Sequence, residues 1–171
     1  QGARTINDAA VEILKILSNK YDVQVIFQTG KKNFERVIEQ LIKIYPEYEN
    51  DKNLIIKPYF DDMVTVLKAS DIAVSRAGSL SLSEIEACGI ASILVPYPHA
   101  AADHQRKNAR CMVEKGASLY LEDSDVNEKT LLENIVLLVT NREKLAGLQE
   151  AALKLAKYDG VQKIVEQLEN V

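Results

Sequence analysis

Residues 72–95 of the chain, IAVSRAGSLSLSEIEACGIASILV, decide the fold class. An apolar run over 72–74 predicts a strand, residues 82–88 have helical character, and a second apolar run over 92–95 predicts another strand, ended by Pro96. Two short apolar strands joined through a helix are typical of a βαβ unit, whose strands lie parallel in one sheet. The stretch therefore predicts an α/β fold built on a parallel sheet.

Strand and helix alternate on both sides of this unit as well. The further predicted elements are a helix over 4–19, a strand over 23–27, a helix over 33–44, a strand over 54–56, a short helix with Met63, Val66 and Leu67, a helix over 103–115, an extended segment over 118–121, and two or three helices ending near Val171. This order predicts one domain over residues 1–171, with a doubly wound parallel sheet covered by helices on both faces. Because the strand before the first helix is usually central in such a sheet, and none precedes residue 4, we expect a core strand to be missing.

The composition excludes several function classes. With 171 residues, 47% of them hydrophobic and 27% charged, the chain can bury a core and is neither disordered nor fibrous. A formal net charge of -4 argues against nucleic acid as a partner, because phosphate binding usually requires a basic surface. The cluster of Arg106, Lys107 and Arg110 is interpreted as a solvated helix face.

The junction over residues 75–84 has the features of an anion site. Ligands of parallel α/β sheets bind beyond the carboxyl ends of the strands, where loops lead into helix N-termini. Here a strand ends at Ser75, Gly78 permits a tight turn, and a helix is predicted to begin near Ser81. Unpaired backbone N–H groups at that helix start suit a diphosphate, and the hydroxyls of Ser79 and Ser81 add donors.

The same junction also fits a purely structural interpretation. Ser81 and Glu84 match the Ser-x-x-Glu capping box, in which both side chains only satisfy the helix end. Spacing alone leaves capping and ligand binding open. The pattern is neither G-x-G-x-x-G nor a Walker loop, so neither a dinucleotide nor an ATP site is indicated.

A second junction, over residues 96–105, leads into the helix that carries Asn108. Polar side chains at this helix start, facing the same crevice, are suited to sugar hydroxyls. A surface or capping role is the alternative for His104. His99 and His104 have no accompanying ligand set that would make a metal site.

These segments resemble the donor-site signature of the MurG family of glycosyltransferases. The resemblance rests on residues 75–85, 95–99 and 103–105 with Asn108-Ala109, and further on residues 1–4, 28–30, 59–63 and 114–117. It runs in order over essentially the whole chain. It implies the C-terminal half of a GT-B enzyme, a Rossmann-like domain that binds UDP-N-acetylglucosamine.

The resemblance also implies roles for individual positions. The substrate-binding set is Phe60, Met63, Arg76, Gly78, Ser79, Leu80, Ser81, Glu84, His104, Gln105 and Asn108. In the family, the carboxylate at the position of Glu84 holds the ribose hydroxyls, and the backbone at Phe60 reads the uracil edge with Met63 nearby. The loop at residues 79–81 holds the diphosphate, and residues 104–105 contact the sugar. Some members have two glutamines at this last pair, whereas here the first is histidine.

The implied reaction is inverting transfer of N-acetylglucosamine to the muramyl sugar of a pyrophosphoryl-undecaprenol lipid, on the cytoplasmic side of the bacterial plasma membrane. The general base and the lipid contacts belong to an N-terminal acceptor domain. We therefore expect this chain to bind donor, to contain no catalytic residue and to be inactive alone, with neither metal nor cofactor. The alternatives are another UDP-sugar transferase of glycolipid synthesis, or a donor-binding subunit that needs a separate acceptor-domain partner.

Overall fold

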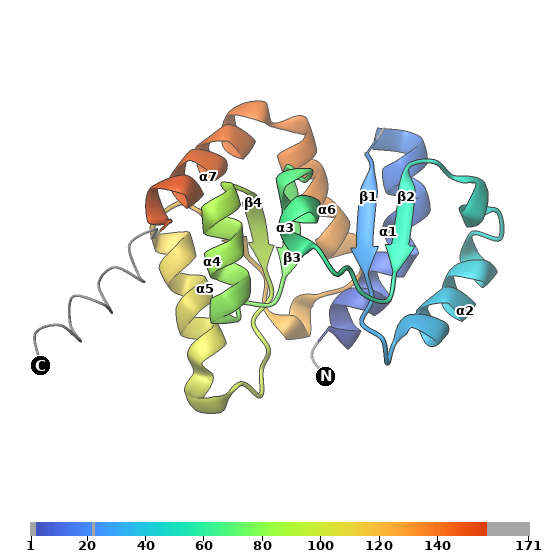
Figure 1. The fold of residues 1–171 in the computed structure, drawn as a ribbon, viewed down its shortest axis with the longest axis horizontal. Coiled ribbons are helices and arrows are strands. Elements are labelled where there is room, and N and C mark those ends of the chain that lie inside the picture. The colour runs from blue at the N-terminus through green and yellow to red at the C-terminus, as the bar shows by residue number, and fades with distance from the viewer. Residues whose placement is uncertain (1–2, 22, 157–171) are drawn as a thin grey trace, which may run out of the picture.

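The computed structural model describes residues 3–21 and 23–156, and within them helices and parallel strands alternate (Figure 1). The elements are α1 (Arg4–Tyr21), β1 (Val25–Gln28), α2 (Phe34–Ile44), η1 (Tyr48–Asn50), β2 (Leu54–Lys57), α3 (Met63–Lys68), β3 (Ile72–Ser75), α4 (Ser79–Cys88), β4 (Ala91–Leu94), η2 (Ala101–Asp103), α5 (His104–Glu114), β5 (Ser118–Tyr120), η3 (Asp123–Asp125), α6 (Glu128–Thr140) and α7 (Arg142–Leu155). The helices predicted beyond α7 lie outside the described residues. The predicted order of elements is confirmed.

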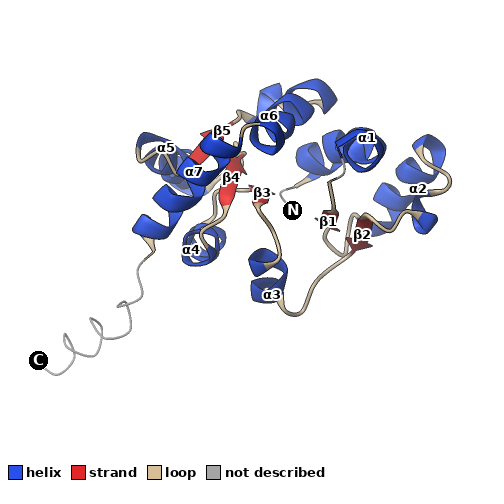
Figure 2. Cartoon of the chain, turned by 90° about the horizontal axis from the view of Figure 1, so that it is seen from above, coloured by secondary structure: helices blue, strands red, loops and turns tan. Residues whose placement is uncertain are grey.

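Hydrogen bonding divides the strands into two parallel sheets. β1 pairs with β2, and β3, β4 and β5 form the second sheet in that order. Figure 2 shows the five strands as a row from β5 to β2, with α3 and α4 on one side and α1 and α6 on the other. Within the described residues, β1 and β3 are therefore neighbours in this row but are not hydrogen-bonded to each other, so each is an edge strand of its own sheet.

The two faces of β4 explain the layers of the three-stranded sheet. All four of its residues are buried, and alternate side chains of a strand point to opposite faces. Ala91 and Ile93 belong to a core with α1, α6 and α7, whereas Leu94 packs with α4 and α5. A parallel sheet buried on both faces is what the continuous apolar run predicts.

Helix α1 joins the two sheets. It is amphipathic, and its residues Ile13 and Leu17 pack in the core of the three-stranded sheet. Val11 and Leu14, on an adjoining part of its surface, pack with Phe27 of β1 and with α2. Among the described residues, no helix is both long and apolar enough to cross a membrane.

Candidate functional site

The loops that follow β3 and β4 lie at the same edge of the sheet, because parallel strands end on one side. Asn108 of α5 donates a hydrogen bond from Nδ2 to the carbonyl oxygen of Ala77, 3.1 Å away. Gln105, one turn earlier, accepts a hydrogen bond at Oε1 from the backbone N–H of Tyr97, at 3.0 Å. These two bonds hold the start of α5 against both loops, so two of the predicted blocks lie in contact with one another.

Helix α4 begins at Ser79, not near Ser81 as the sequence predicts. Its N-cap is Gly78, which is extended (φ -70°, ψ 145°) and makes no side-chain capping bond. A hydrogen bond of 3.0 Å from Leu82 N–H to Gly78 oxygen starts the helix, so the N–H groups of residues 79–81 have no acceptor within it. Three such groups at the positive end of the helix dipole favour an anion.

The capping box predicted for Ser81 and Glu84 is wrong, because Gly78 occupies the cap position. Glu84 lies in the second turn of α4 and is half-buried. Across residues 3–21 and 23–156, its carboxylate has no hydrogen-bond or ion-pair partner. The carboxylate oxygens are not among the buried polar atoms of the described residues, so they are open to accept from the hydroxyl of a ligand.

The loop between β4 and α5 is strained. Ala102 (φ 49°) and Asp103 (φ 56°) are the non-glycine residues with positive φ in the described part of the chain. This region costs a residue with a Cβ roughly 1–2 kcal/mol, and such strain concentrates at functional sites. His104 follows directly, and its Nδ1 donates to the carbonyl oxygen of Ala101 at 2.6 Å. Helix α5 has Asp103 at its N-cap and no side-chain capping bond, so this contact of His104 is not an N-cap, and its Nε2 is left for another partner.

The third predicted block lies at the ends of β1 and β2. The backbone N–H of Phe60 donates to Oε1 of Gln28, the last residue of β1, at 2.8 Å. The Nζ atom of Lys57, the last residue of β2, lies 5.4 Å from the centroid of the Phe60 ring. Met63 follows as the first residue of α3. Phe60 and Met63 therefore lie beyond the two-stranded sheet, and the remaining predicted residues beyond the three-stranded one.

Helix α3 is short and is fixed by its cap. Asp62 accepts a hydrogen bond of 3.0 Å at Oδ1 from the N–H of Thr65, and hydrogen bonds from Thr65 hold the pKa of this carboxyl below its usual value. Leu67 packs against the apolar cluster that contains Leu82 and Ile85 of α4. The block around Phe60 is thereby attached to the helix that forms the predicted anion site.

Arg76, the first residue after β3, has among its contacts hydrogen bonds to oxygen atoms of three separate described residues. Its Nη1 atom donates to Asp123 Oδ1 at 2.6 Å and to the carbonyl oxygens of Val95 and Pro96 at 3.1 and 3.2 Å. The Arg76 side chain is 14% exposed, so solvent screens this ion pair little. Arg76 therefore connects the loops after β3 and β4 to the segment after β5.

A pocket of about 420 Å³ opens beside this ion pair. It is lined by Arg4, Thr5, Asn33, Arg76, Tyr97, Pro98, His99 and Asp123. Only Arg76 belongs to the predicted set, although the resemblance over residues 1–4 and 95–99 is a signal for four of the others, Arg4, Tyr97, Pro98 and His99. Thr5 and Asp123 had no such signal. Their hydrogen bond joins residues 118 positions apart. The described residues contain no group of three or more His, Cys, Asp or Glu placed to hold a metal ion.

Residues 1–167 match the family described as "Glycosyltransferase family 28 C-terminal domain". The chain belongs to this family. The family 28 domain is 36% identical over 171 residues to the "UDP-N-acetylglucosamine--N-acetylmuramyl-(pentapeptide) pyrophosphoryl-undecaprenol N-acetylglucosamine transferase" of Desulforamulus reducens, covering 100% of this chain and 46% of the relative. It is 38% identical over 171 residues to the protein of the same name from Bacillus cytotoxicus, with the same coverage. The domain thus spans about half the length of these relatives.

Two solved structures have the same fold as the family 28 domain. Acinetobacter baumannii MurG matches with a TM-score of 0.78 at 24% identity, covering 99% of this chain and 47% of that one. A structure titled as the glycotransferase of kitacinnamycin matches with a TM-score of 0.64 at 18% identity, covering 93% and 38%. The predicted fold class, an α/β domain matching the C-terminal half of a GT-B enzyme, is confirmed, as is the resemblance to MurG.

Proposed function

We propose that this domain binds UDP-N-acetylglucosamine as the donor for inverting transfer of N-acetylglucosamine to the undecaprenyl-pyrophosphoryl-muramyl-pentapeptide lipid of peptidoglycan biosynthesis. The start of α4 carries the proposal. Three backbone N–H groups without a helical acceptor lie on the same helix as the unpartnered Glu84 carboxylate and at the sheet edge that holds the 420 Å³ pocket. The names of relatives at 36% and 38% identity support it.

The nucleotide occupies the side of the site formed by α3 and α4. The N–H groups of Ser79, Leu80 and Ser81 donate to the diphosphate, with Gly78 leaving the approach open, since a Cβ there would have no atom within 4 Å. Glu84 accepts hydrogen bonds from the ribose hydroxyls. The Phe60 backbone, with Met63 nearby, meets the uracil edge. Its N–H already donates to an amide oxygen, that of Gln28, and a uracil carbonyl offers the same acceptor chemistry.

The sugar lies toward α5 and the pocket. The Oε1 atom of Gln105 accepts from Tyr97, which leaves its NH₂ group to donate to a sugar hydroxyl. His104 presents Nε2, its Nδ1 being bonded to Ala101. Asn108 and Arg76 complete the predicted set, and in this structure both bond to the surrounding loops.

The reaction follows from the chemistry of the leaving group. An acceptor hydroxyl attacks the anomeric carbon while the bond to the diphosphate breaks, so negative charge grows on UDP. N–H groups oriented before the reaction stabilise that charge as it develops, without reorganisation. The acceptor hydroxyl belongs to the muramyl sugar of the lipid, and the general base and the lipid contacts lie in an N-terminal acceptor domain of the same protein. This chain alone binds the donor without transferring it, and the intact protein works at the cytoplasmic face of the plasma membrane.

We also propose that a further parallel strand joins β1 to β3 in the intact protein. The observed order, β2-β1 and then β3-β4-β5, matches a doubly wound sheet that lacks its central strand. Val25 of β1 and Val74 of β3 both flank the core that α1 covers. The β1 amides that point away from β2, those of Ile26 and Gln28, gain partners. Slower hydrogen exchange at these amides in the intact protein than in this chain supports the strand; equal exchange contradicts it.

Calorimetric titration with UDP-N-acetylglucosamine, UDP-glucose and NAD tests the proposed function. Selective binding of UDP-N-acetylglucosamine, weakened about tenfold by Glu84→Gln, supports it. Glu133→Gln is the control, because Glu133 is an exposed carboxylate on α6. Binding of NAD, or indifference to all three nucleotides, contradicts the proposal.

His104 is the observation that favours a second candidate, a transferase of glycolipid synthesis with another UDP-sugar. It replaces a glutamine that some family members have at the sugar-reading pair. Preference for UDP-glucose in the same titration supports that candidate. A donor-binding subunit is distinguished by transfer activity that appears only when a separate acceptor-domain chain is added.

A further inference from the structure

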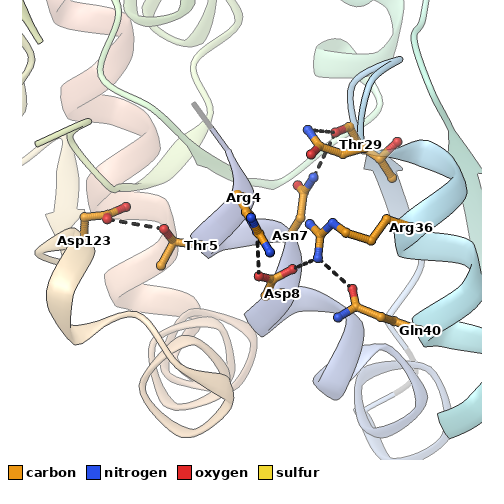
Figure 3. A network of polar contacts seen from close by, with 9 residues as sticks. Arg4, Thr5, Asn7, Asp8, Thr29, Arg36, Gln40 and Asp123 are labelled. Atoms are coloured by element: carbon orange, nitrogen blue, oxygen red, sulfur yellow. Dashed lines mark hydrogen bonds and ion pairs between the residues drawn. The ribbon is translucent and has the colours of Figure 1, made fainter. Parts of the chain in front are cut away.

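Asp123, at the start of η3, bonds to two distant parts of the site through its two carboxylate oxygens. Its Oδ1 accepts from Nη1 of Arg76 at 2.6 Å, and its Oδ2 accepts from the hydroxyl of Thr5 at 3.3 Å (Figure 3 shows the contact with Thr5). The Asp123 side chain is 19% exposed. One carboxylate thus joins the segment after β5 to the loop after β3 and to the start of α1.

The contact with Arg76 continues into the loop that carries the sugar-reading residues. Arg76 also donates to the carbonyl oxygens of Val95 and Pro96, and its guanidinium lies 5.6 Å from the centroid of the Tyr97 ring. The backbone N–H of Tyr97 in turn donates to Gln105. A continuous series of contacts therefore runs from Asp123 to the side chain that we assign to the sugar.

The contact with Thr5 continues into the other sheet. Two residues later on α1, Asn7 is buried and donates from Nδ2 to the carbonyl oxygen of Thr29, just after β1, at 2.8 Å. Asp8 pairs with Arg36 of α2 (Figure 3). The first turns of α1 are therefore fixed on both sides, and the bond from Thr5 to Asp123 is a polar contact with the segment after β5.

We infer that Asp123 is a positioning residue for the sugar of the nucleotide-sugar, acting through Arg76 and Thr5 on the wall of the 420 Å³ pocket and on Gln105. The inference rests on the proposed function. Only a carboxylate offers an oxygen acceptor to each donor and also a charge that compensates a shielded guanidinium. In the described part of the chain, Asp123 bonds neither to residues 79–81 nor to Phe60, and it lines the pocket, so we expect it to affect the sugar more than the nucleotide.

Calorimetry on the intact protein with UDP and with UDP-N-acetylglucosamine tests the inference. Asp123→Asn removes the charge and one acceptor, and it should weaken binding of UDP-N-acetylglucosamine about tenfold while that of UDP changes less than about twofold. Asp125→Asn is the control, because Asp125 lies in the same short helix, is exposed and does not line the pocket.

Two further variants keep the test decisive if Asp123→Asn unfolds the protein. Thr5→Val removes one hydroxyl and leaves the ion pair between Asp123 and Arg76. Like Asp123→Asn, it should weaken binding of UDP-N-acetylglucosamine more than binding of UDP. Arg76→Met should produce the Asp123→Asn effect, and the double variant should lose no more than either single one. Equal losses for both ligands, or no loss, overturn the inference. A wild-type protein that binds UDP but not its sugar conjugate, or that binds neither, overturns the proposed function first.

Discussion

The Nδ2 atom of Asn108 lies 3.1 Å from the carbonyl oxygen of Ala77 and joins the helix of the sugar-reading residues to the loop of the anion site. Ala77 is fully buried, so removing this donor leaves its carbonyl without a partner. Asn108→Ala should lower the free energy of unfolding by about 1–3 kcal/mol, measured by urea denaturation. Lys107→Ala, at the exposed neighbouring position, should cost less than about 0.5 kcal/mol. Equal effects would show that the Asn108 bond contributes nothing.

The backbone N–H of Phe60, which we propose binds the uracil base, donates a hydrogen bond to the side chain of Gln28. Gln28→Ala frees that group, so the affinity for UDP should rise about threefold, the equivalent of one weak net hydrogen bond. Gln24→Ala is the matched control, because Gln24 is an exposed glutamine just before β1 and has no such contact with Phe60. A fall in affinity for Gln28→Ala would mean that Gln28 itself contacts the ligand.

The end of α4 is packed against α7 at a glycine. Gly89 has φ +65°, and a Cβ there would lie 2.4 Å from Cγ of Leu153. Gly116 has nearly the same φ, +69°, with no atom within 4 Å of such a Cβ. Gly116→Ala should cost about 1–2 kcal/mol of stability from backbone strain, and Gly89→Ala roughly 1–3 kcal/mol more from overpacking. If thermal unfolding shows equal stability losses for Gly89→Ala and Gly116→Ala, the contact between α4 and α7 does not require a glycine at position 89.

The Asp62 cap of α3 should make the stability of the domain depend on pH. Hydrogen bonds from Thr65 lower the pKa of Asp62, so its contribution to stability is complete above the unfolded pKa of about 3.9 and is lost as the pH falls through the lower folded pKa. Thr65→Val should move the pKa of Asp62 back toward its usual value in a carboxyl NMR titration. An unchanged pKa would contradict the assigned cause.

The sequence predicted the elements well because apolar periodicity is local. The β-branched runs and the amphipathic pattern of α1 identify strands and helices without any knowledge of their partners. The start of α4 was misplaced by two residues, because Ser81 with Glu84 is a stronger capping signal than Gly78, which occupies the cap.

The missed parts of the site depend on contacts between distant segments. Arg76 and Asp123 are 47 residues apart, and Thr5 and Asp123 are 118 apart. No periodicity or short motif encodes such a pairing. The sequence therefore indicated which loops carry the site and left open how they are held together.

The most direct test of the central claim is a backbone NMR titration of this chain with UDP-N-acetylglucosamine. The claim predicts that the largest amide shifts occur at residues 79–81 and at Phe60, with smaller shifts at Gln105. Shifts concentrated on α6 or α7, or no shifts at saturating ligand, would contradict it.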